Sequence, residues 1–235
     1  MVSSIKIEER IIKGVFQERP NRFAALVKIG DVVSLAFLPN PGRMHELLIP
    51  GTEVFLRKVI KEKRKICYDL IGVAYNSQMV SLDSRVPNKL VLEALQNRDI
   101  AELSKYTVIK PEFTYGHSRF DFFLANELEI CLLEVKSSTL VKDGLTMFPD
   151  AVTERGKRHV NELVKAKKEG ARACILFLVQ RTDAYSFAPS DETDPKFGKA
   201  LRKAANEGVE VYAYKTEIAK NFSSITLSSI LRVNL

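Results

Sequence analysis

The sequence predicts an α+β chain in two parts: a small N-terminal β-barrel over residues 1–84 and a C-terminal α/β domain with a central mixed sheet over residues 85–235. In the first part, short runs rich in β-branched and aromatic residues are separated by Gly, Pro, Asn and Asp. After Ser84, amphipathic helical segments alternate with apolar strands. A chain of 235 residues, 46% of them apolar, is large enough to bury a core in both parts.

The first part is predicted to be almost entirely β-structure. Only residues 45–48 have a helical pattern, and it is brief. Closing several short strands into a barrel removes their exposed edges, which favours a barrel over an open sheet. The expected strands cover residues 5–7, 11–16, 23–29, 32–37, 53–59 and 65–75.

The second part is predicted to have the element order α-β-β-β-α-β-α-β, followed by a strand-rich tail over residues 223–235. Gly170 and Gly208 follow two of the helical patterns and are typical helix ends. The order indicates a mixed sheet rather than a purely parallel one. The expected helices cover residues 88–103, 152–169 and 194–207, and the expected strands cover 107–115, 119–125, 130–137, 171–180 and 209–214.

The charge balance favours an anionic partner, with nucleic acid first. Thirty-six Lys and Arg outnumber 29 Asp and Glu, which gives a net charge of +7. Residues 57–65 hold six basic residues and one acid between two expected strands. This basic loop is either an ordinary solvated surface or a segment that follows a phosphate backbone.

Several classes of protein are excluded or disfavoured by composition. The longest apolar run, residues 173–179, is far too short to span a membrane, and the N-terminal segment has no apolar signal-peptide core. The three cysteines, Cys67, Cys131 and Cys174, lie in apolar stretches, which is typical of buried thiols in the cytoplasm. The sequence has no zinc-site, Walker, dinucleotide-binding or serine-hydrolase motif.

The candidate catalytic residues lie on the expected strands between residues 110 and 138. Strand periodicity puts Asp121 with Arg119 and Phe123 on one face, and Phe120, Phe122 and Leu124 on the other. Symmetric pairing about the turn at residues 126–129 places Asp121 opposite Glu134. Symmetric pairing about the turn at residues 116–117 places Glu112 opposite Asp121. We therefore expect a row of three carboxylates across three strands.

Such a row needs a partner that neutralises it, because like charges on opposite strands are destabilising. Mg²⁺ or Mn²⁺ would serve, since these cations take one or two carboxylates and keep several waters. Lys136 shares a strand face with Glu134 and would lie beside a water that attacks phosphorus. The alternative is a surface ladder in which Glu112, Asp121 and Glu134 form salt bridges with Arg119 and Lys136, and a β-bulge would break the assumed register.

Asp121 followed by Glu134-Val135-Lys136 resembles the PD-(D/E)xK nuclease core. The resemblance implies that Asp121, Glu134 and the carbonyl of Val135 bind the metal and that Lys136 serves the water. It also implies a further glutamate on the first helix, for which Glu93 is the candidate.

Over nearly its whole length the chain resembles the sugar fermentation stimulation protein A family. The resemblance implies an OB-fold-like N-terminal barrel, a nuclease-like C-terminal domain, DNA binding and, in some bacteria, regulation of sugar metabolism genes. It is carried, in order, by the segments 21–23, 39–48, 118–122, 134–140 and 148–159.

Basic residues outside the core motif are predicted to contact phosphates. Arg155 and His159 share a face near the start of the expected helix at 152–169, where phosphates bind well, and Gly156 indicates a close approach by a neighbour or ligand. Arg43 leaves a Pro-Gly turn at residues 40–43. The predicted nucleic-acid contacts are Arg22, Arg43, Arg57, Lys58, Lys61, Lys63, Arg64, Lys65, Arg119, Arg155 and His159.

The leading hypothesis is a cytoplasmic DNA-binding protein with a Mg²⁺- or Mn²⁺-dependent nuclease site. One alternative is a non-catalytic DNA-binding regulator on an inactive nuclease scaffold. A second is a metal-dependent hydrolase of a small phosphorylated substrate. Single-stranded DNA and RNA stay open as partners, a membrane is not expected, and a homodimer is compatible with the sequence.

Overall fold

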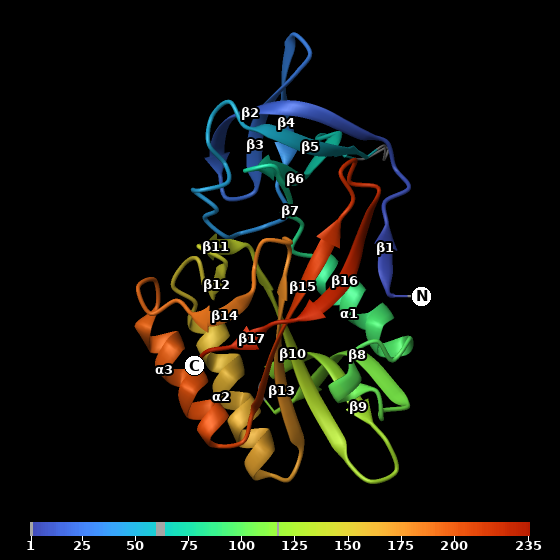
Figure 1. The fold of residues 1–235 in the computed structure, drawn as a ribbon, viewed down its shortest axis with the longest axis vertical. Coiled ribbons are helices and arrows are strands. Elements are labelled where there is room, and N and C mark those ends of the chain that lie inside the picture. The colour runs from blue at the N-terminus through green and yellow to red at the C-terminus, as the bar shows by residue number, and fades with distance from the viewer. Residues whose placement is uncertain (1, 60–63, 117) are drawn as a thin grey trace.

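The computed structural model describes residues 2–59, 64–116 and 118–235. Figure 1 shows two parts placed end to end along the long axis of the molecule, a barrel at one end and a sheet with helices at the other. In the barrel, strands follow the order β4-β3-β2-β5-β6-β7, and a further pairing of β4 with β6 closes it. Its strands are β2 (Ile11–Asn21), β3 (Ala24–Ile29), β4 (Val32–Phe37), β5 (Glu53–Lys58), β6 (Tyr68–Tyr75) and β7 (Gln78–Ser81).

The predicted OB-like barrel is confirmed, but the helix expected at residues 45–48 is wrong. The chain there makes a turn, in which the N–H groups of Leu47 and Leu48 both donate to the carbonyl of Met44. The segment is too short to offset the unfavourable free energy of helix nucleation, and Pro50 follows two residues after Leu48. Met44, Leu47 and Leu48 instead fill the barrel core.

The C-terminal part contains a mixed sheet, as predicted, and this sheet has seven strands. Its order is β1-β16-β15-β13-β10-β9-β8, with β10, β13 and β15 parallel to one another. The strands are β1 (Ser4–Lys6), β8 (Val108–Tyr115), β9 (Ser118–Ala125), β10 (Ile130–Ser138), β13 (Arg172–Val179), β15 (Glu210–Ile218) and β16 (Ser224–Ile230).

Helices cover both faces of this sheet. Helix α1 (Val86–Gln96) packs on one face, while α2 (Glu154–Lys168) and α3 (Pro195–Asn206) pack on the other. Helix α1 is shorter than the helix expected over 88–103, because it ends at Gln96. A separate 3₁₀ turn (Ala101–Leu103) follows it. In the parts described, no helix is long and apolar enough to cross a membrane.

A second, smaller sheet was not expected from the sequence. It has the order β11-β12-β14-β17, and its strands are short, so no periodicity could show them. It consists of β11 (Leu140–Lys142), β12 (Leu145–Phe148), β14 (Ser186–Pro189) and β17 (Arg232–Val233).

The first strand of the chain belongs to the C-terminal sheet and not to the barrel. Ser4, Ile5 and Lys6 of β1 pair with β16, and Ile5 packs against the core under α1. A strand that pairs with a partner more than two hundred residues away leaves no local sequence pattern that shows which sheet it joins.

The barrel and the α/β domain share a packed junction. Phe222 lies against Phe55, with ring centroids 4.7 Å apart, and joins Ile71 in a small apolar cluster. A Cβ on Gly72 would lie 1.9 Å from the ring of Phe222, so this close approach requires glycine. Nearby, the hydroxyl of Ser81 donates to Oε1 of Gln180 at 2.7 Å.

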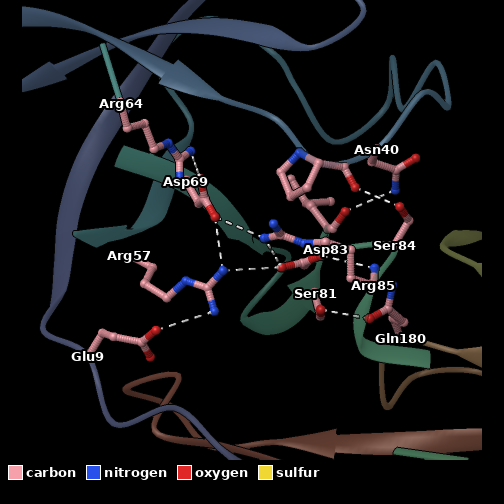
Figure 2. Close-up of polar contacts among 12 residues, drawn as sticks. Glu9, Asn40, Arg57, Arg64, Asp69, Ser81, Asp83, Ser84, Arg85 and Gln180 are labelled. Atoms are coloured by element: carbon pink, nitrogen blue, oxygen red, sulfur yellow. Dashed lines mark hydrogen bonds and ion pairs between the residues drawn. The ribbon is translucent and has the colours of Figure 1, made fainter. Parts of the chain in front are cut away.

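A charged network lies beside this apolar cluster (Figure 2). The Asp69 side chain is only 1% exposed and accepts hydrogen bonds from three arginines, Arg57 and Arg85 at 2.9 Å and Arg64. Arg85 also binds Asp83. Burial alone would raise the pKa of Asp69, but the hydrogen bonds from Arg85, Arg57 and Arg64 outweigh it, and the net pKa is lowered.

Candidate functional site

The strand register around Asp121 is the one that symmetric turns predict. Strand β9 pairs with β10 through Leu133 opposite Phe122, and with β8 through Phe113 opposite Phe120. Pairing between β9 and β10 ends there, one residue before Asp121 and Glu134 would face each other. Oδ2 of Asp121 instead accepts the backbone N–H of Val135 at 2.7 Å. The carboxylate therefore lies where the two strands separate.

The expectation that Phe120 shares a face with Phe122 and Leu124 is wrong. Phe120 belongs to the core under α2, whereas Phe122 and Leu124 belong to the core under α1. On the neighbouring strand β8, at the level of Asp121, Glu112 has a φ of +54°, and it forms no strand pair with Asp121. The left-handed residue interrupts the regular alternation of β8 at the same level.

Glu134 is the most buried member of the candidate site. Its side chain lies on β10 and is 3% exposed. Oε1 contacts the ammonium of Lys136 and lies 2.5 Å from Nδ1 of His159 on α2. Oε2 is buried and has no hydrogen-bond partner in the described part of the chain. Burial would raise the pKa of Glu134, but the hydrogen bond from His159 and the charge of Lys136 outweigh it, so the net pKa is lowered.

Asp121 has the opposite electrostatic balance. Its Oδ1 accepts a hydrogen bond from the amide of Asn88 at 2.6 Å. Burial, together with the negative charge of Glu134, raises the pKa of Asp121 despite the hydrogen bond from Val135. The two carboxylates thus have pKa values shifted in opposite directions, a pattern that is common at functional sites.

Glu93 lies outside this cluster. Its Oε1 accepts the backbone N–H of Ser4 at 3.1 Å and so ties β1 to α1. Asn88, five residues earlier on the helix, is turned by roughly 140° relative to Glu93 and reaches Asp121. The contribution of α1 to the site is therefore an amide, which no motif in the sequence indicated.

Glu112 is also outside the cluster, so the predicted row of three carboxylates is wrong. Its side chain is 71% exposed and lies 3.8 Å from Arg119, itself 61% exposed. In the described ranges, no three His, Cys, Asp or Glu side chains converge as a metal-binding group. Two carboxylates, Asp121 and Glu134, remain.

Helix α2 contributes His159 in a way that differs from the prediction. His159 is buried against Glu134 rather than turned to solvent for phosphate contact, whereas Arg155 is exposed. Thr153 caps the helix by accepting the N–H of Gly156 at 3.0 Å. A Cβ on Gly156 would lie 2.8 Å from Thr153 and 3.3 Å from Phe197 of α3, so close packing explains this glycine.

The barrel brings a loop directly to the α/β site. A Cβ on Gly42 would lie 2.6 Å from Oδ2 of Asp150, the residue shortly before α2. Asn40 of this loop lines a cavity of about 30 Å³ together with Ser137, the residue after Lys136. The turn at residues 40–43 therefore lies beside the strand end that carries the candidate site.

Arg19 fixes this loop. Its guanidinium donates to four backbone carbonyls, those of Gly42 and Arg43 at 2.6 Å, Arg22 at 2.8 Å and Asn40 at 3.1 Å. The side chains of Arg22 and Arg43 are exposed. No motif in the sequence indicated this role of Arg19, because its partners are backbone carbonyls.

The basic loop is divided by the structure. Lys58 and Lys65 are exposed, but Arg57 is bound by carboxylates at the junction between barrel and sheet, and Arg64 binds Asp69. Arg57 therefore serves a structural ion pair rather than a free phosphate contact. Lys61 and Lys63 lie outside the described residues.

Both parts of the chain match known domains. Residues 18–82 match the SfsA N-terminal OB domain, and residues 85–222 match the sugar fermentation stimulation protein RE domain. The chain belongs to the sugar fermentation stimulation protein family. A family homolog from Caldanaerobacter subterraneus is 45% identical over 219 residues, covering 93% of this chain and 96% of the homolog. One from Clostridium botulinum strain Kyoto is 46% identical over 232 residues, covering 98% and 100%.

The fold of the family is also seen in a solved structure. Pyrococcus furiosus SfsA in complex with Ca²⁺ superposes on the whole of this chain and the whole of its own, with a TM-score of 0.91 and 28% identity.

Proposed function

We propose that this member of the sugar fermentation stimulation protein family binds DNA and cleaves phosphodiester bonds with Mg²⁺ or Mn²⁺ at Asp121, Glu134 and Lys136. The observation that carries the proposal is the convergence of a buried carboxylate, Glu134, a half-buried carboxylate, Asp121, and a lysine where β9 and β10 separate. Glu134 and Lys136 are in contact, and Asp121 binds the backbone between them. Acid, acid and lysine are the groups that metal-assisted phosphodiester hydrolysis uses.

The residues present fit a divalent cation. Among the residues that the structure describes, Oε2 of Glu134 is buried without a hydrogen-bond partner, and an unpaired carboxylate oxygen in such a place is costly unless something positive binds it. Asp121 supplies a second carboxylate, and Mg²⁺ commonly takes only one or two, with water completing its shell. Asp121 and Glu134, with the carbonyl of Val135, would hold the ion.

The bound ion would supply positive charge beside the scissile phosphate and make a nearby water more acidic. Side chains of the protein would position the attacking water and hold the metal ligands. The Lys136 ammonium, held by Glu134, would position the attacking water and stabilise negative charge that develops on the phosphate. Asn88 and His159 hold Asp121 and Glu134 in place.

A relative's ion supports an oxygen-rich metal site in this fold. The similar Pyrococcus furiosus protein was solved in complex with Ca²⁺, a hard cation that also prefers carboxylate and carbonyl oxygens. For this chain we propose Mg²⁺ or Mn²⁺, because two protein carboxylates and several waters suit their smaller coordination shell.

Exposed arginines lead from the barrel to this site and support DNA as the substrate. Arg22 is exposed in the turn between β2 and β3, and Arg43 is exposed in the loop at residues 40–43; Arg19 binds the backbone of both, and Arg155 is exposed on α2. Guanidinium groups bind phosphates in bidentate fashion, so a strand lying on the barrel would be guided to Lys136.

The test is a calorimetric titration of wild type, Glu134→Ala and Asp121→Asn with Mg²⁺ and Mn²⁺. A parallel assay follows cleavage of labelled single- and double-stranded DNA and RNA. We expect wild type to bind and cleave, and both variants to lose cleavage. Glu112→Gln is the matched control, since this exposed carboxylate on β8 lies outside the cluster.

Two results would contradict the proposal in different ways. Metal binding without cleavage of any nucleic acid would leave the metal site and redirect the search to small phosphorylated substrates. DNA binding without any metal binding would make the protein a non-catalytic DNA-binding regulator on a nuclease scaffold.

A further inference from the structure

The outer face of the barrel carries aromatic side chains that the catalytic proposal does not use. Phe23 is 44% exposed, and its ring stacks on that of Phe37 with centroids 6.4 Å apart and planes 24° from parallel. Large exposed aromatic rings are uncommon on a soluble surface unless something covers them. We call Phe23 and Phe37 the aromatic pair.

Arginines flank both rings. The guanidinium of Arg22 lies 6.0 Å from the ring centre of Phe23, and that of Arg64 lies 5.6 Å from the ring centre of Phe37. A hollow of about 450 Å³ opens beside Phe37 and is lined by Arg64, Lys65 and Ile66 as well. Aromatic rings combined with cations at this spacing suit flat, anionic ligands.

The apolar surface continues along β4. Val33 and Leu35 are 55% and 43% exposed, and they alternate with Phe37 on the same strand face. Leu35 pairs with Leu26 on β3. In OB-fold barrels the face formed by the second and third strands is a usual place for oligonucleotides, and β3 and β4 are the second and third strands of this barrel.

Hydrogen bonds hold the backbone at Arg22 and Phe23 in place. Phe23 donates its N–H to Oδ1 of Asn21 at 2.9 Å, and Arg19 fixes the carbonyl of Arg22. The same Arg19 binds the carbonyls of Gly42 and Arg43, in the loop that lies against Asp150. Preorganised rings lose little entropy when a ligand stacks on them. The guanidinium of Arg19 thus joins the aromatic pair to the loop beside the candidate site.

We propose that Phe23 and Phe37 stack the bases of a single-stranded nucleic acid, so that the protein binds single strands more tightly than duplex. The inference rests on the proposed function and adds its substrate class. Bases in a duplex are already stacked and cannot offer a free face to Phe23, whereas an unpaired base can. Arg22 and Lys65, whose side chains are exposed, would hold the phosphates on either side.

The test measures binding of a fluorescein-labelled oligothymidine and of a duplex of equal length by anisotropy. Phe23→Ala should weaken binding of the single strand by about 5-fold to 150-fold, the range measured when a stacking aromatic is removed, and change duplex binding little. Tyr185→Ala is the control, because this tyrosine is 73% exposed on the α/β domain.

A tryptophan reporter tests stacking directly. The chain contains no tryptophan, so Phe23→Trp introduces a single indole at this position. Its emission should be quenched by oligothymidine while affinity is kept. Circular dichroism of each variant shows whether the fold is intact.

The outcomes separate this inference from the proposed function. If Phe23→Ala binds the single strand as tightly as wild type, or the indole is not quenched, the stacking site is wrong while DNA binding and cleavage stand. If wild type binds neither single strand nor duplex at low salt, the proposed function and this inference both fail.

Discussion

Oδ2 of Asp121 accepts the backbone N–H of Val135 at 2.7 Å, at the point where β9 separates from β10. A side chain thereby takes a hydrogen bond that a neighbouring strand would otherwise accept. The bond holds one candidate metal ligand against the backbone between the other two functional residues, Glu134 and Lys136. Removing the Asp121 carboxylate should therefore reduce cleavage more than it reduces the stability of the fold.

Asp121→Ala should abolish cleavage and leave DNA binding at low salt intact, because phosphate contacts come from arginines elsewhere. Cleavage and anisotropy measured on the same preparation test this. Asp121→Asn retains an oxygen that can accept the Val135 N–H, so it separates loss of charge from loss of the strand contact. Cleavage that persists in both variants would contradict the site assignment.

His159 is expected to act as a positioning residue for Glu134. Its Nδ1 lies 2.5 Å from Oε1 of Glu134, and loss of such a partner behind a metal ligand commonly weakens metal affinity by about 10-fold to 100-fold. We expect this loss for His159→Ala in a Mn²⁺ titration, with partial recovery in His159→Gln. Unchanged Mn²⁺ affinity in His159→Ala would show that the contact only serves packing.

Arg43 is expected to contact a phosphate through its exposed side chain. Arg43→Ala should weaken DNA binding for all sequences alike and reduce the slope of log affinity against log salt by about 1. Lys199→Ala, an exposed cation on α3, is the matched control and should leave the slope unchanged. An equal effect in both variants would point to general charge and not to a contact at Arg43.

Asp69→Asn should destabilise the fold by about 3 to 5 kcal/mol, because it removes the charge that three arginines share at the junction. Urea unfolding measures the free energy. Asp191→Asn breaks an exposed pair with Arg202 and should cost less than about 1 kcal/mol.

The same aspartate predicts a pH dependence of stability. Because the pKa of Asp69 is lowered in the folded protein, its ionised form stabilises the fold above the unfolded pKa of about 4. That contribution is lost as the pH falls through the folded pKa. The free energy of unfolding of wild type should therefore fall more steeply below pH of about 4 than that of Asp69→Asn. Parallel curves would exclude Asp69 as the cause.

Gly72→Ala should destabilise the protein by about 1 to 3 kcal/mol, because its Cβ would overlap the ring of Phe222. In the double variant with Phe222→Ala the overlap is relieved, so adding Gly72→Ala should then cost little. Urea unfolding of both single variants and the double variant completes this cycle. Additive losses would show that Gly72 is needed for its backbone and not for contact with Phe222.

Local pattern was enough for the elements that depend on neighbours in sequence. The two tight hairpins put β8, β9 and β10 in the predicted register, since a short turn determines which residues face each other. The three helices and the parallel strands also follow from periodicity. The prediction for Glu112 was wrong because a positive φ at one residue changes where its side chain points without changing the strand register.

By itself, the sequence predicted the two-part fold and a position for Asp121 close to Glu134 and Lys136, because strand pairing and turn length depend on a few neighbouring residues. Only the tertiary structure decided which distant groups join them. Asn88 on α1 donates a hydrogen bond to Asp121, and His159 on α2 binds Glu134. Arg57 forms an ion pair with Asp69. Packing of helices and barrel against the sheet sets these contacts, and the burial and charge balance of each carboxylate follow from that packing.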